Sequence, residues 1–66
     1  MKTVIEDAQD KCQRSSRLAY DIKDKEDRGR LNDAVSNVYF AIRKGAIPML
    51  VDRVKYMDAI DKELRR

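Results

Sequence analysis

The chain has 66 residues, of which 15 are Lys or Arg, 12 are Asp or Glu, one is Cys and none is His. This length predicts one small domain over residues 1–66, and the residue counts exclude an internal disulfide and an ordinary zinc site. Because the core of so short a chain barely offsets its loss of conformational entropy, we expect close helix packing or a second copy of the chain, which favours a homodimer.

The net charge is +3 although 41% of the residues are charged, and the apolar residues recur at helical spacing. These features are typical of a folded helical protein. No apolar run approaches 18 residues and no signal-peptide core is present, which predicts a cytoplasmic protein without a membrane segment. The modest basic excess permits a nucleic-acid partner or an acidic protein partner and requires neither.

The first expected helix covers about residues 4–28. Thr3 and Glu6 have the spacing of a capping box at its start. The apolar pattern changes phase at Gly29, so we expect this glycine to end the helix. Mostly small residues at steps of three and four predict an inward seam that approaches a neighbour closely: Ile5, Ala8, Cys12, Ser15, Ala19 and Ile22.

The second expected helix covers about residues 31–44, with Gly45 in a left-handed position after its last turn. Arg43 and Lys44 suit the negative end of its dipole. Five residues at helical spacing predict its core-facing stripe: Leu31, Val35, Val38, Tyr39 and Ile42.

The third expected helix covers about residues 48–64, with Pro48 in its first turn. Its apolar stripe comprises Leu50, Val54, Met57, Ile60 and Leu64. Two ion pairs are expected at helical spacing, Asp58–Lys62 and Asp61–Arg65. The fold class is therefore all-α. We expect either a small three-helix bundle or a helical hairpin whose second arm, residues 31–64, is kinked at Gly45–Pro48. Either form is expected to dimerise into a larger helical bundle.

Catalytic chemistry has little support in the sequence. The usual general acid–base residue, His, is missing, and Cys12 lies on the inward seam without an assignable base. Gly29 and Gly45 stand alone and form no phosphate-binding loop. We therefore expect a protein that is not an enzyme and that uses no cofactor, no metal and no small-molecule substrate.

Phe40 points away from the core-facing stripe, among Ser36, Asn37, Arg43 and Lys44. One interpretation is packing against another helix of the bundle or dimer. The other is an anchor for a protein partner, since aromatic and Arg residues dominate interface energetics. We expect a non-enzymatic interaction or regulatory protein that binds a partner through these five residues. Short, highly charged chains of this kind are common among phage and mobile-element accessory proteins that modulate a host protein.

The segment Tyr39–Pro48 (YFAIRKGAIP) resembles the helix-turn segment of excisionase-type DNA-binding regulators, in which a basic helix ends in Gly-x-Ile-Pro before a small wing. Ala41, Gly45 and Val51 also have helix-turn-helix spacing. The resemblance spans about a quarter to a third of the chain. It implies a small DNA-binding regulator, with a helix-turn-helix around Ala41-Gly45-Pro48, as the alternative function. The implied phosphate contacts are Arg43, Lys44, Arg53 and Lys55.

Overall fold

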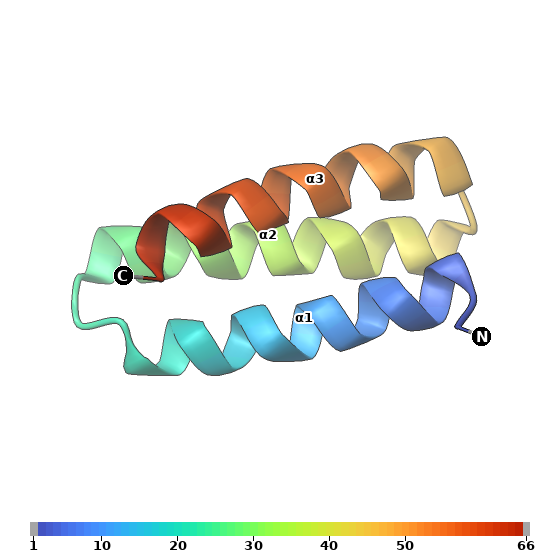
Figure 1. Cartoon of the computed structure of the whole chain (residues 1–66). Helices are drawn as coiled ribbons and strands as arrows, with labels where there is room; N and C mark the ends of the chain where they lie inside the picture. Colours follow the sequence, from blue (N-terminus) through green and yellow to red (C-terminus); the bar gives the residue numbers. More distant parts are fainter. Residues whose placement is uncertain (1, 66) are drawn as a thin grey trace.

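The computed structural model describes residues 2–65, and over that range the regular structure is entirely helical. Helix α1 spans Val4–Asp21, α2 spans Lys25–Lys44 and α3 spans Ile47–Leu64. The helices lie side by side, with α2 antiparallel to both α1 and α3 (Figure 1). The three-helix bundle is thus the form observed, and residues 31–64 do not make one continuous helix. No helix in residues 2–65 is long and apolar enough to cross a membrane.

The break between α1 and α2 lies at residues 22–24, which corrects the predicted break at Gly29. Ile22 is extended (φ −79°, ψ 122°) and packs against the core. Asp24 then caps α2, because its Oδ1 accepts hydrogen bonds from the backbone N–H groups of Glu26 (2.9 Å) and Asp27 (3.2 Å). This cap satisfies two otherwise unpaired helix donors. The predicted helix bounds 4–28 and 31–44 therefore become Val4–Asp21 and Lys25–Lys44.

The other predicted helix ends are confirmed. At the start of α1, Glu6 N–H donates to Thr3 Oγ1 (3.1 Å) and Thr3 N–H donates to Glu6 Oε1 (3.3 Å), which completes the capping box. At the end of α2, Gly45 is left-handed (φ 68°) and its N–H donates to Ile42 O (3.1 Å). Pro48 lies in the first turn of α3.

The two glycines predict opposite responses to alanine. Gly29 lies inside α2 without a positive φ, and a Cβ there would meet no atom within 4 Å. Gly29→Ala should therefore raise the free energy of unfolding by about 0.5–1 kcal/mol, because alanine loses less backbone entropy in a helix. Gly45→Ala should lower it by roughly 1 kcal/mol, because a Cβ is strained at positive φ. Urea denaturation followed by circular dichroism measures both, and a destabilised Gly29→Ala variant would contradict the placement of Gly29.

The core confirms most of the predicted stripes. Along α1 the buried residues are Ala8, Cys12, Ser15 and Ala19, along α2 they are Leu31, Ala34, Val35, Val38 and Ala41, and along α3 they include Leu50, Met57 and Ile60. The exception is Tyr39, which is 41% exposed. At eight residues from Leu31 it is rotated by about 80° around the helix, which places it at the edge of the buried face. The buried face of α2 instead extends to Ala34 and Ala41, because α2 packs against two neighbouring helices.

Candidate functional site

The five residues predicted to bind a partner all lie exposed on α2: Ser36, Asn37, Phe40, Arg43 and Lys44. Their spacing places them around the side of α2 that faces away from buried Leu31 and Val38. Phe40 is 46% exposed. In the described chain it is therefore not a core residue.

Two cations flank the ring of Phe40, and they come from different helices. Lys44, one turn further along α2, has its Nζ 5.4 Å from the ring centroid. Arg53 of α3 has its Cζ 5.5 Å from the same centroid and donates a hydrogen bond from Nη1 to Asn37 O (3.2 Å). Sequence reasoning did not connect Arg53 with Phe40. The contact depends on the register of α2 against α3, which no local pattern in the sequence specifies.

The cations around Phe40 are not neutralised by carboxylates. Elsewhere in residues 2–65, ion pairs join Lys2 to Asp10, Lys11 to Asp7 and Asp58, Arg30 to Asp27 and Glu63, and Arg65 to Asp61. Arg43, Lys44 and Arg53 take part in no ion pair with the described carboxylates. Their charges therefore remain available to a partner.

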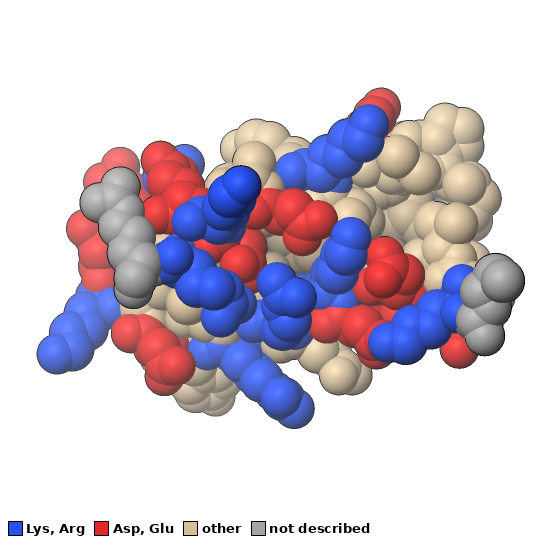
Figure 2. Space-filling view, in the orientation of Figure 1, with Lys and Arg blue, Asp and Glu red and all other residues tan. Residues whose placement is uncertain are grey.

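Exposed apolar side chains also lie at the start of α3, where Val51 faces the groove between α1 and α3 and not the Phe40 ring. Ile47, Met49 and Val51 are each between 38% and 41% exposed. Figure 2 shows uncharged residues gathered at the end of the molecule where α2 passes into α3, while charges of both signs cover much of the remaining face. Met49 lies one turn before Arg53 on the same side of α3. We call Asn37, Phe40, Lys44, Met49 and Arg53 the Phe40 surface.

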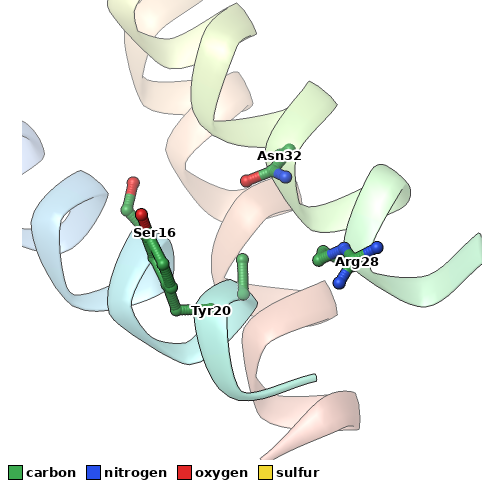
Figure 3. A pocket seen from close by; sticks show the side chains of 5 residues that line it. Ser16, Tyr20, Arg28 and Asn32 are labelled. Atoms are coloured by element: carbon green, nitrogen blue, oxygen red, sulfur yellow. The ribbon is translucent and has the colours of Figure 1, made fainter. Parts of the chain in front are cut away.

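A second feature is an open hollow of about 420 Å³ between α1 and α2, lined by Ser16, Ala19, Tyr20, Arg28 and Asn32. In Figure 3, Ser16 and Tyr20 come from α1 and lie across from Arg28 and Asn32 of α2. Tyr20 is 90% exposed. Among the described residues Ser16 has no hydrogen-bonded base, so the hollow offers polar contacts and an aromatic ring without a nucleophile–base pair.

A buried polar cluster joins α1 to the end of α3. Asp61, which is 4% exposed, accepts a hydrogen bond at Oδ2 from Ser15 Oγ (2.7 Å). Arg65 donates to both carboxylate oxygens, from Nε at 3.0 Å and from Nη2 at 3.2 Å. The Arg65 guanidinium, helped by Ser15, lowers the pKa of Asp61 below its ordinary value even though burial opposes this. The predicted Asp61–Arg65 pair is confirmed, whereas Asp58, predicted to pair with Lys62, pairs with Lys11 of α1. The burial of Asp61 and its bond to Ser15 are features that spacing alone did not indicate.

Cys12 is expected to be chemically inert in the folded protein. It is fully buried, and burial, together with the negative charge of Asp58, raises its pKa to about 11. Because the thiolate is the reactive form, labelling by a disulfide reagent at pH 8 should be at least about 100-fold slower in the native protein than in urea. Stopped-flow absorbance measures both rates. Equal rates would show that Cys12 is accessible in solution.

The geometry departs from the excisionase-like arrangement. Residues 47–64 form one helix, so the wing implied by the resemblance is not made, and α3 lies antiparallel along α2 (Figure 1). A DNA-binding helix-turn-helix instead crosses its helices at about 90–120°. The predicted helix-turn-helix around Ala41, Gly45 and Pro48 is therefore corrected to a tight antiparallel turn. The implied phosphate contacts also separate, since Lys55 lines a groove between α1 and α3 with Val4 and Asp7.

Among residues 2–65 no group of three or more Cys, Asp or Glu side chains is arranged to hold a metal ion. Comparison of the chain with protein-family models, with curated proteins and with solved structures finds no match.

Proposed function

We propose that this chain is a small non-enzymatic interaction protein that regulates another protein by binding it through the Phe40 surface. One observation carries the proposal: Phe40 is half exposed between Lys44 and Arg53, and no described carboxylate neutralises either cation. Aromatic and Arg residues contribute most of the binding energy at protein interfaces. Binding would occlude a site on the partner or recruit it.

Because Phe40 is exposed, its proposed role in binding a partner can be tested without unfolding the protein. An exposed cation–π contact is worth only about 0.5–1 kcal/mol, and the core of α2 lies on the opposite side of the helix. Removal of the ring should therefore leave the bundle intact. A loss of partner binding can then be read as a loss of contact and not of structure.

Self-association is part of the same proposal. A chain of 66 residues has a small core that barely offsets its loss of conformational entropy, which favours a homodimer that buries further surface. Sedimentation velocity would give its mass. The lone, buried thiol of Cys12 fits a cytoplasmic location. The accessory role for a phage or mobile element rests on chain length and charge alone.

The test is capture of a partner from a lysate of the encoding organism by the immobilised wild type, Phe40→Ala and Tyr20→Ala. Tyr20 is the matched control, because it is an exposed aromatic residue on α1, away from the Phe40 surface. We expect one protein to be retained by the wild type and by Tyr20→Ala and to be reduced at least tenfold with Phe40→Ala. Nuclease treatment should not change this. Retention by Phe40→Ala, with its circular dichroism unchanged, would refute the proposal.

A nucleic acid is the second candidate partner, since Arg43, Lys44 and Arg53 form no ion pairs with the described carboxylates. Lys55 would not contribute to the same contact, because it lines the separate groove between α1 and α3. Capture that disappears after nuclease treatment, and that weakens steeply with salt, would favour this candidate.

A further inference from the structure

The guanidinium of Arg53 is held in place before any partner arrives. Its Nη1 donates to the Asn37 carbonyl oxygen across the α2–α3 contact, and its carbon lies over the Phe40 ring. Its Nε and Nη2 groups make no hydrogen bond to the described residues. Guanidinium N–H groups match the geometry of a carboxylate. Arg53 therefore presents an oriented carboxylate-binding group next to an exposed aromatic ring.

The cations at this place form no ion pair with the described carboxylates. Lys44 and Arg53 both lie within 5.5 Å of one ring centroid, with Arg43 beside Lys44 in the chain, and none of the three has a carboxylate partner among the described residues. Cations this close repel one another, so an approaching anion is stabilised by several charges at once. These cations are complementary to a negatively charged partner.

The Phe40 surface also presents apolar area. Phe40 is 46% exposed and Met49 is 38% exposed. Phe40 lies beside Arg53 across the contact between α2 and α3, and Met49 lies one turn before Arg53 on α3. An apolar side chain placed here would be buried on binding, while water still reaches the surrounding cations. We propose that the Phe40 surface binds an acidic protein segment in which one apolar side chain is flanked by Asp or Glu residues, an inference that rests on the proposed function.

Two exposed acids argue against a polynucleotide at the same place. Asp33 lies one turn before Asn37 on α2, and Asp52 directly precedes Arg53 on α3. A nucleic-acid strand carries a phosphate at every residue and would meet one of these carboxylates as it extended along either helix. A short peptide segment with two or three carboxylates around one apolar residue need not extend past either acid. In such a peptide the carboxylates would pair with the cations, and the apolar side chain would contact Phe40, so both would contribute to the affinity.

The experiment is a peptide-display selection with an unbiased library, in which the wild-type protein is the bait and Phe40→Ala is the counter-selection. We expect the enriched sequences to carry at least two Asp or Glu residues within three positions of a Leu, Ile, Phe or Met. Enriched sequences without such acids would overturn the proposal. So would a failure to enrich any sequence over the Phe40→Ala bait.

The best enriched peptide is then titrated against variants by fluorescence anisotropy. Affinity should fall at least tenfold for Phe40→Ala and for Arg53→Ala and should stay within twofold for two controls on α1, Tyr20→Ala and Arg17→Ala. It should also weaken as salt rises. Unchanged affinity in the Arg53→Ala variant, or tighter Phe40-dependent binding of a single-stranded oligonucleotide of equal charge, would overturn the proposal.

The outcomes separate this inference from the proposed function. If the lysate experiment captures a protein through Phe40 but no acidic peptide is enriched, the acidic-segment inference is refuted and the interaction function stands. If capture from lysate does not depend on Phe40, both are refuted. Sedimentation of the bait alone shows whether a second copy of the chain occupies the surface, and a dimer lost in Phe40→Ala would also refute the inference.

Discussion

Replacement of Leu50 by alanine is expected to lower the free energy of unfolding by about 2–5 kcal/mol. Leu50 is fully buried near the start of α3, in the core shared with α1 and α2. Truncation removes apolar burial and leaves a cavity that a tightly packed bundle cannot fill. A domain of 66 residues has a total stability of roughly 3–10 kcal/mol, so this one substitution should remove a large share of it.

The neighbouring residue supplies the control. Val51 is 38% exposed on the same turn of α3, and Val51→Ala should change stability by no more than about 0.5 kcal/mol. Urea denaturation followed by circular dichroism at 222 nm measures both variants. Equal midpoints for the two would show that α3 is not packed in the register described.

Replacement of Asp61 by asparagine is expected to lower the free energy of unfolding by about 1.5–3 kcal/mol at pH 7, because hydrogen bonds to a charged group are lost in a buried place. Asp61 binds Ser15 of α1 and Arg65 at the end of α3. Ser15→Ala removes only one of the three hydrogen bonds to this carboxylate, so it should cost less than Asp61→Asn, about 1.5 kcal/mol. Asp33→Asn removes an exposed carboxylate from α2 and controls for net charge. An Asp61→Asn variant as stable as this control would refute a stabilising role for the cluster.

The same cluster predicts a pH dependence with a defined sign. The pKa of Asp61 is lower in the folded protein than its ordinary value, chiefly because of Arg65. Folding is therefore favoured by the ionised carboxylate above the ordinary aspartate pKa of about 4, and this contribution is lost as pH falls through the lower folded pKa. The stability difference between the wild type and Asp61→Asn should thus narrow as pH is lowered from 6 to 3. A difference that is constant over this range would contradict the assignment.

Local patterns predicted a large part of the fold because each depends on neighbours in sequence. The capping box of Thr3 and Glu6, the left-handed Gly45 and the proline in the first turn of α3 are all settled within a few residues. The small-residue seam of α1 was likewise correct, since periodicity alone identifies a buried face. The break at Gly29 was wrong because a glycine can remain in a helix when a better cap, here Asp24, lies one turn earlier.

The proposed interaction surface was only partly predictable. Phe40 and its neighbours share one side of α2, so the sequence could group them, and the structure leaves them exposed. The place of Arg53 beside the ring was not found, because it depends on how α3 lies against α2. That dependence matters for the proposed function, since Arg53 places an oriented cation beside an exposed aromatic ring.

The amino-acid sequence by itself determined the helical class and the buried faces, because helical periodicity and caps act over one or two turns. It also contains no His and only one Cys, which limits the side chains that could serve in acid–base or nucleophilic catalysis. Only the tertiary structure decided the register of the helices. That register brings Ser15 to Asp61 and Arg53 to Phe40, residues that are far apart in the chain. Contacts of this kind form only when apolar faces from separate helices are buried together, which no local pattern of residues specifies.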